Sequence, residues 1–232
     1  MPIDIQGRID RLLLRLQQRG LATPRATLYA EGVKTKLNQA KFSLENLRRL
    51  ERLQDQPDTQ DATTISIGQA LPNVSEQVIY YCDCFWDFLR SALDITGQLV
   101  NELRSLGISE RNVDIKAVAS AIKSRELGST LDKALDELLN SSAFTQLEDY
   151  RHCSTHRRPI YIQTRTMTTS VTGTSGYYGS SDTRIIVERN ICTNPWDLKP
   201  RVRVGVRPVV GYCESLLQRI RGKLDTIINQ LA

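Results

Sequence analysis

"NVSEQVIYYCDCFWDFLRSALDITGQLVNELRSLG" (residues 73–107) is the stretch that decides the fold, because it predicts one long amphipathic helix. Asn73 is a good N-cap, and Glu76 three residues later completes a capping box. Gly107 marks the expected end of the helix. The apolar residues that recur along one face are Ile79, Cys82, Trp86, Leu89, Leu93, Val100 and Leu103.

The rest of the first two-thirds of the chain repeats this helical period. Residues 54–72 contain two prolines and many polar residues, which predicts a loop before the long helix. Ser109 and Ser129 are expected to start two shorter helices, with Gly128 between them. The further helices are therefore expected over about residues 5–16 with Gly20 as the cap, 29–47, 110–127, 130–152, and 213–231 at the end of the chain.

The period changes from helical to alternating after Pro159. "PIYIQTRTMTTSV" (159–171) and "TRIIVERNI" (183–191) predict two strands joined by a Gly- and Tyr-rich tip. "RVRVGVR" (201–207) predicts a third extended segment with one cationic face. We therefore expect a mainly α fold, an antiparallel helical bundle over residues 1–158. Residues 159–232 would add a basic β extension and a C-terminal helix packed on the same domain.

Composition narrows the class of protein. With 40% apolar and 25% charged residues, the chain resembles an ordinary globular protein. It contains no run of about 18 apolar residues and no apolar leader, so we expect no membrane span or signal peptide and a cytoplasmic location. Five scattered cysteines favour reduced thiols. No phosphate loop, dinucleotide fingerprint or nucleophile elbow is present.

Charge is distributed unevenly along the chain. Residues 1–150 hold 18 Lys and Arg against 21 Asp and Glu, a net charge of −3. Residues 151–232 hold 13 against 5, a net charge of +8. Such a region attracts a polyanion, although a solvated basic surface without a partner has the same composition.

"YRHCSTH" (150–156) contains both histidines of the chain, and it lies where the basic region begins. Histidine can serve as general acid or base near neutral pH, and arginine holds phosphate oxygens with a planar fork. RNA brings its own nucleophile, the 2′-hydroxyl, so these two residue types suffice for cleavage without a metal. The alternative is a structural role, in which an Arg and two His interact favourably with the helix dipole at the C-terminal end of a helix. A zinc site at His152, Cys153 and His156 lacks a fourth ligand nearby, and we expect no metal and no cofactor.

The stretch from Arg151 to His156 resembles the signature of the HEPN superfamily: an arginine, a polar residue and a histidine after four to six intervening residues. The resemblance implies an all-helical bundle with the motif near the end of a late helix. It also implies a metal-independent endoribonuclease of toxin–antitoxin or defence type, in which Arg151 and His156 are catalytic and His152 assists. A non-catalytic HEPN-like module that binds a nucleotide or a protein is the alternative.

Geometry poses a problem for a site built from one chain. Five residues of continuous helix separate Arg151 from His156 by about 140° around the axis. Because Pro159 disfavours helix at Arg158, we expect the helix to end within or just after the motif. Either the helix end folds His156 back toward Arg151, or two protomers present paired motifs across a shared cleft, as the resemblance implies.

Several other residues are candidates for supporting roles. Asp83, Asp87, Arg90 and Asp94 form a stripe on the long helix, from which Asp87 or Asp94 could orient the site, although such a stripe is more often a solvated face. We expect the substrate to be RNA, the protein to be a homodimer, and an antitoxin or inhibitor protein to be its partner. The sequence leaves open which histidine is the base. The residues expected to bind RNA are Arg157, Arg158, Arg201 and Arg203.

Overall fold

The computed structural model contains seven helices and one two-stranded hairpin in the part of the chain that it describes. This part comprises residues 5–54, 74–156, 161–171, 182–192 and 209–231, and side chains are described for 7–51, 77–150 and 209–231. The elements, in order, are α1 (Ile5–Gln18), α2 (Pro24–Gln54), α3 (Val74–Leu103), α4 (Ile115–Arg125), α5 (Thr130–Leu139), α6 (Ser142–His156), β1 (Tyr161–Val171), β2 (Asp182–Cys192) and α7 (Val209–Asn229).

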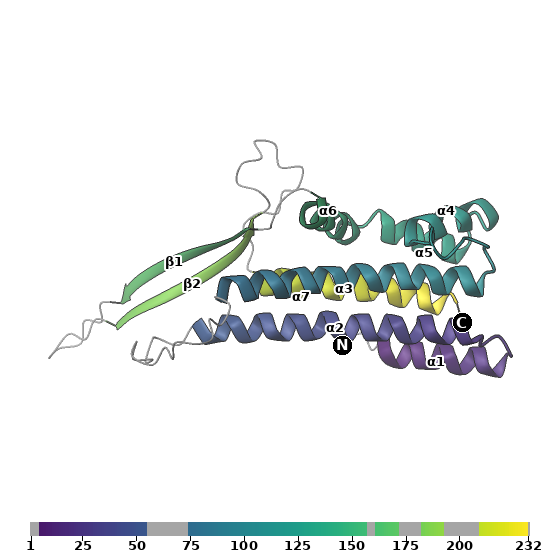
Figure 1. The fold of residues 1–232 in the computed structure, drawn as a ribbon, viewed down its shortest axis with the longest axis horizontal. Coiled ribbons are helices and arrows are strands. Elements are labelled where there is room, and N and C mark those ends of the chain that lie inside the picture. The colour runs from purple at the N-terminus through teal and green to yellow at the C-terminus, as the bar shows by residue number, and fades with distance from the viewer. Residues whose placement is uncertain (1–4, 55–73, 157–160, 172–181, 193–208, 232) are drawn as a thin grey trace.

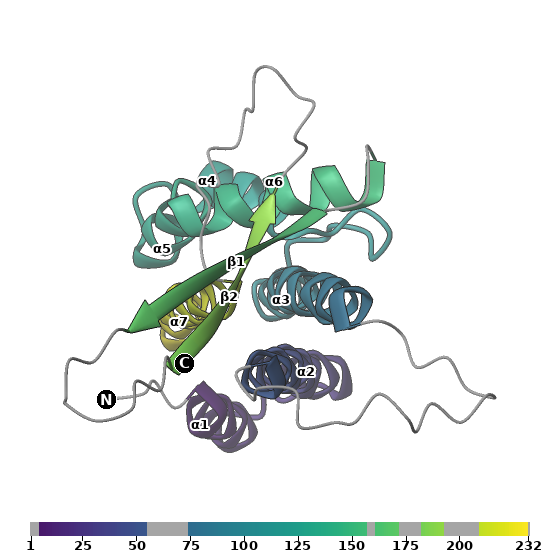
Figure 2. The same cartoon turned by 90° about the vertical axis from the view of Figure 1, so that its left-hand side faces the viewer.

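The helices form three layers (Figure 1). The lowest layer contains α1 and α2, the middle layer contains α3 and α7, and the short helices α4, α5 and α6 cover the top (Figure 2). α7 contacts α1, α2, α3, α5 and α6, so the C-terminal helix completes the centre of the bundle. None of the described helices has the length and apolarity needed to cross a membrane.

α3 is the central helix of the core, as the opening stretch predicts. Phe85, Leu89 and Leu93 on this helix are fully buried. Burying side chains of this size contributes about 1.5–3 kcal/mol each, so a stripe of them is enough to hold a long helix in place. Gly97 allows α3 to approach the start of α4, because a Cβ atom there would lie 3.1 Å from the Ile115 backbone nitrogen. The long helix predicted over 73–107 is therefore confirmed, although it ends at Leu103.

Several predicted helix boundaries are wrong: α2 is longer than the expected 29–47, α7 begins before residue 213, and two shorter helices differ for reasons that the caps explain. The helix expected over 110–127 begins at Ile115, because Asp114 and not Ser109 is the N-cap, and its side chain accepts from the Ala117 amide at 2.7 Å. The helix expected over 130–152 is two helices, α5 and α6, since the Ser141 hydroxyl accepts from the Phe144 amide and starts a new helix. Ser129, by contrast, caps α5 as predicted.

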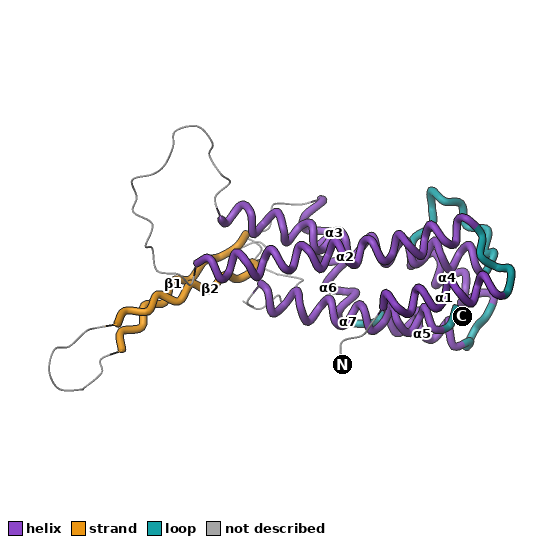
Figure 3. Tube along the Cα trace, turned by 90° about the horizontal axis from the view of Figure 1, so that it is seen from below, coloured by secondary structure: helices purple, strands orange, loops and turns teal. Residues whose placement is uncertain are grey.

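β1 and β2 pair as a single antiparallel hairpin, with Tyr161 opposite Cys192 and Val171 opposite Asp182. The hairpin extends away from the bundle and contacts it through α3 and α7 (Figure 3). The two predicted strands therefore form a two-stranded ribbon that projects from the bundle, and no wider sheet is found among the described residues. The third predicted strand, residues 201–207, lies outside the described residues.

Candidate active site at the end of α6

α6 carries the Arg–His motif in its last two turns and ends at His156. The backbone is helical through the whole motif, so the helix end does not fold His156 back toward Arg151. Arg151 and His156 therefore stay about 140° apart around the axis of α6. The structure therefore does not provide the arrangement in which the helix end folds back to bring the two residues of one chain together.

Tyr150, directly before Arg151, anchors this end of α6 to α3. Its hydroxyl donates to Asp83 Oδ1 at 2.6 Å. Its ring stacks on Trp86, with centroids 4.1 Å apart and planes 4° from parallel. Trp86 in turn contacts the ring of Tyr212 on α7. The position of the backbone at the start of the motif is thus fixed by three aromatic rings from three helices.

Burial perturbs both members of the Tyr150–Asp83 pair. Desolvation raises the pKa of the Tyr150 phenol well above its ordinary value, so this hydroxyl stays protonated and donates. Desolvation also raises the pKa of the Asp83 carboxyl; the hydrogen bond from Tyr150 opposes this shift and the charge of Asp87 adds to it. A half-buried carboxylate, Asp83 on α3, therefore lies beside the residue that precedes the motif.

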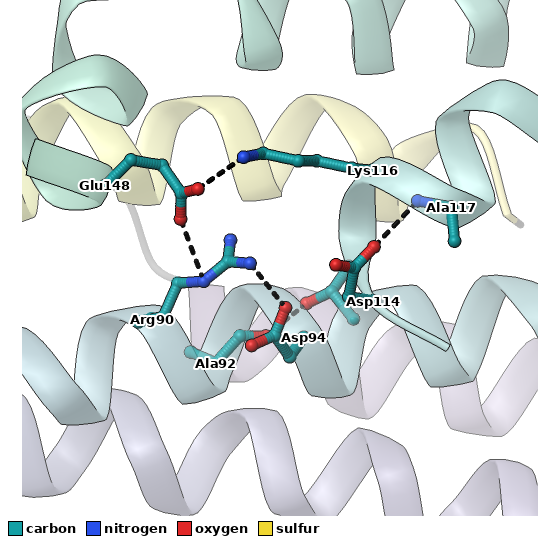
Figure 4. Close-up of polar contacts among 8 residues, drawn as sticks. Arg90, Ala92, Asp94, Asp114, Lys116, Ala117 and Glu148 are labelled. Atoms are coloured by element: carbon teal, nitrogen blue, oxygen red, sulfur yellow. Dashed lines mark hydrogen bonds and ion pairs between the residues drawn. The ribbon is translucent and has the colours of Figure 1, made fainter. Parts of the chain in front are cut away.

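A charge network holds the middle of α6 (Figure 4). Arg90 on α3, whose side chain is only 6% exposed, lies between Asp94 and Glu148 with nitrogen–oxygen distances of 3.2 Å to each. Glu148 on α6 also pairs with Lys116 on α4. The Arg90 guanidinium packs against the Phe144 ring at 5.5 Å. This network joins α3, α4 and α6 one turn before the motif.

Only part of the polar stripe of α3 is the solvated face that its sequence favours. α6 lies over the stripe at Arg90, which is buried, and bonds Asp83, which is half-buried. Asp94 pairs with Arg90, so it belongs to the charge network and not to the motif. Asp87 lies on the same stripe and its side chain is exposed. Arg157, Arg158, Arg201 and Arg203 lie outside the described residues.

Sequence reasoning missed the residues that fix α6. The roles of Tyr150, Glu148 and Lys116 depend on the crossing of α6 over α3, which no local pattern reveals. One signal was present: an arginine, Arg90, inside an acidic stripe indicates an internal ion pair as readily as a solvated face.

The described cysteines lie in different environments. Cys82 is buried and Cys84 is partly exposed, because residues two apart on a helix lie about 200° apart around its axis. Cys213 is fully buried, and burial raises the pKa of its thiol well above its ordinary value, which disfavours the thiolate that a metal requires. Within the described ranges no three His, Cys, Asp or Glu side chains cluster.

The family of the chain follows from its sequence as a whole. Residues 29–189 match the family model of the Cthe2314-like HEPN family. The match runs from within α2 into β2 and contains the Arg–His motif, so the chain belongs to this family and carries a HEPN-type domain. No curated protein and no solved structure matches the chain.

Proposed function

We propose that this protein is a metal-independent endoribonuclease whose catalytic residues are Arg151 and His156, with His152 assisting. One histidine takes the proton of the 2′-hydroxyl, and an acid protonates the leaving 5′-oxygen. Arg151 stabilises the negative charge that develops on the phosphorus oxygens. The products are a cyclic phosphate and a free 5′-hydroxyl, so the cleavage needs no water and no cofactor.

The observation that carries the proposal is the position of the motif. In a chain of the HEPN family, an arginine and the only two histidines fall in the last two turns of a late helix. Tyr150 and Glu148 fix that helix to α3 directly before the motif. A rigid support of this kind suits catalytic groups, because a small displacement of a reacting group costs much of its rate.

The basic second part of the chain is the proposed RNA-docking surface. Arg165 lies opposite Glu188 in the hairpin, whereas Arg184 and Arg189 lie opposite Thr169 and Thr164. Phosphate contacts from such arginines give affinity that falls with salt concentration. Replacing Arg201 and Arg203 together with Glu should weaken RNA binding and make log affinity less steep against log salt. An unchanged slope in a folded variant would refute docking there.

The assembly and partners belong to the same proposal. Two protomers form a homodimer in which the motifs share one cleft, since one continuous helix separates Arg151 from His156. An inhibitor protein, or antitoxin, restrains the nuclease in the cytoplasm of the producing cell. Sedimentation at micromolar concentration tests the first point: a monomer that still cleaves RNA would exclude the shared cleft.

A cleavage assay tests the central proposal. The full-length protein is incubated with end-labelled single-stranded RNA in excess chelator, beside the Arg151→Ala and His156→Ala variants. We expect loss of cleavage by a factor of about 100 or more in each variant, the scale of a lost general acid or base for His156 and of a lost transition-state charge partner for Arg151. Arg111→Ala is the matched control, because Arg111 is exposed and lies between α3 and α4, away from α6. It should cleave like the wild type.

Two results would contradict the nuclease. Equal cleavage by the wild type and both variants would mean a contaminating enzyme. No cleavage by any protein, together with a lower melting temperature of Arg151→Ala and His156→Ala, would assign the motif to stabilising the helix end. The chain would then be a non-catalytic HEPN-type binding module.

A further inference from the structure

We propose that the groove between α2 and α3 binds an unpaired base of the RNA substrate. The groove has a volume of about 460 Å³ and opens on the outer surface of the bundle. This inference rests on the proposed function for the identity of its ligand, since RNA supplies the base. Six of the lining side chains carry the argument: Phe42, Tyr80, Tyr81 and Phe88, with the amides of Asn38 and Gln39.

Four aromatic rings give the groove the chemistry of a stacking site. Phe42 and Tyr80 are 61% and 62% exposed, which is unusual because aromatic side chains of this size normally bury most of their area. The rings of Tyr80 and Tyr81 meet edge to face at 5.3 Å. Aromatic side chains that remain open to water are the platforms on which proteins stack unpaired bases.

The polar atoms of the groove suit the edge of a base. Gln39 Oε1 is buried, and the described residues offer it no hydrogen-bond donor. A buried acceptor without a donor destabilises the folded protein, and a ligand that donates a hydrogen bond to it would recover that loss. The exocyclic amino groups of adenine, cytosine and guanine are such donors. Among the described lining residues there is no carboxylate that would repel a nucleotide.

A cation at the margin of the groove fits the phosphate that must accompany the base. Lys36 Nζ lies 5.0 Å from the centroid of the Phe88 ring. Among the described residues it has no carboxylate partner, unlike Lys34 and Lys41 on the same helix. A phosphate next to a stacked base can take this position.

The groove lies beside the face of α3 that holds α6. Tyr80 and Asp87 are seven residues apart and thus separated by only about 20° around α3. Asp83, four residues before Asp87, bonds Tyr150 at the start of the motif. Figure 2 shows α3 between α6 above and α2 below. A short single strand crossing the outer surface of α3 can therefore reach from the groove to the end of α6.

The test is base-dependent binding by the full-length protein. The probe is a fluorescent single-stranded 2′-O-methyl oligonucleotide, which lacks the nucleophile and stays intact, with 2-aminopurine at one position. We expect quenching of 2-aminopurine on binding to the wild type, and roughly tenfold weaker binding by Phe42→Ala, as for loss of one stacking partner. Gln39→Leu should weaken binding as well. Leu28→Ala is the matched control, because Leu28 is 68% exposed on α2 outside the groove and should bind like the wild type.

An abasic oligonucleotide completes the cycle. Removing the base should weaken binding to the wild type more than binding to Phe42→Ala, because the variant has already lost the stacking of Phe42 on that base. Equal effects of the abasic site on both proteins would overturn the proposal. Quenching of the fluorescence of free 2-aminopurine riboside, but not of the oligonucleotide, would also overturn it and would indicate a small nucleoside or nucleotide ligand. Conversion of a dimer to a monomer by Phe42→Ala would overturn it too and would indicate a subunit contact.

The outcome is separable from that of the cleavage assay. Cleavage that depends on Arg151 and His156, with no base dependence at Phe42, leaves the nuclease intact and removes only the groove. Base-dependent binding without cleavage retains the groove in a protein that holds RNA and does not cut it.

Discussion

Asp83 is the residue at which burial and hydrogen bonding oppose each other. Desolvation raises the pKa of its carboxyl, and the Tyr150 hydroxyl limits the rise by donating to the charged form. Trp86 stacks on the ring of Tyr150, and Tyr212 on α7 contacts Trp86 in turn. The position of α6 beside α3 therefore depends on a carboxylate that is costly to keep charged.

The Asp83→Asn variant tests this balance through pH. The pKa of Asp83 in the folded protein lies above its unfolded value of about 3.9, so the folded state binds the proton more tightly. The wild type consequently loses free energy of unfolding as pH rises from that value through the raised one. Asparagine carries no proton and still accepts from Tyr150. In urea denaturation between pH 4 and 7, the free energy of unfolding of Asp83→Asn should rise relative to that of the wild type as pH rises. A difference that stays constant with pH would contradict the raised pKa.

Arg90 is a second residue whose burial lowers the stability of the folded protein unless its charge is paired. Its carboxylate partners Asp94 and Glu148 lie at ion-pair distance, yet Arg90 Nε and Nη1 have no well-aligned acceptor in the described structure. Arg90→Met would leave two neighbouring carboxylates without their shared cation, and we expect a loss of about 3 kcal/mol in the free energy of unfolding. Urea denaturation measures it.

The control for Arg90 is an exposed ion pair between α4 and α5. Lys123 and Asp136 are 3.7 Å apart with side chains more than half exposed, so Lys123→Met should change stability by less than about 0.5 kcal/mol. Adding Glu148→Gln to Arg90→Met should restore part of the loss. Equal losses in Arg90→Met and Lys123→Met would mean that burial adds nothing to the Arg90 network.

The helices show which elements a sequence can predict. α3 and the start of α5 follow from apolar periodicity and the Ser129 cap, which are local signals. The break at Ser141 was missed because apolar periodicity continues across it, and a serine there reads equally well as a helix interior residue. Burial of the Arg90 stripe depends on how α6 crosses α3, a property of the packed bundle. The motif at the end of α6 was predictable because its residues are consecutive.

Two glycines on different helices test how closely the elements approach. A Cβ atom added to Gly97 would lie 3.1–3.2 Å from backbone atoms of Asp114 and Ile115. A Cβ atom added to Gly211 on α7 would have nothing within 4 Å. Gly97→Ala must push α4 away from α3, and we expect a loss of about 1 kcal/mol or more despite the better helix propensity of alanine. Gly211→Ala should gain roughly 0.5 kcal/mol. Thermal denaturation of both decides the matter, and a stabilised Gly97→Ala would show that α4 yields easily.

At the scale of the whole molecule, the helices that hold α6 in place lie in the bundle, and the hairpin and the motif lie at one end of it. The buried core and α7 hold α3 and α6 in position. The hairpin extends from the same end of the bundle that α6 crosses, away from α4 and α5 (Figures 1 and 3). The family match spans the predicted boundary at residue 158, and the division into two parts there stays a prediction. RNA approaching this end would meet the hairpin, the motif and the outer surface of α3 together.

The shared cleft can be tested by mixing two inactive proteins. If one site takes Arg151 from one protomer and His156 from the other, a heterodimer of Arg151→Ala and His156→Ala contains one intact site and one doubly altered site. Random exchange puts half of the dimers in this form, so the mixture should recover about one quarter of the wild-type rate. Each variant alone, exchanged in the same way, is the control. If every site draws both residues from a single helix, the mixture stays inactive, and the continuous helix through His156 would then have to unwind at its end for cleavage to occur.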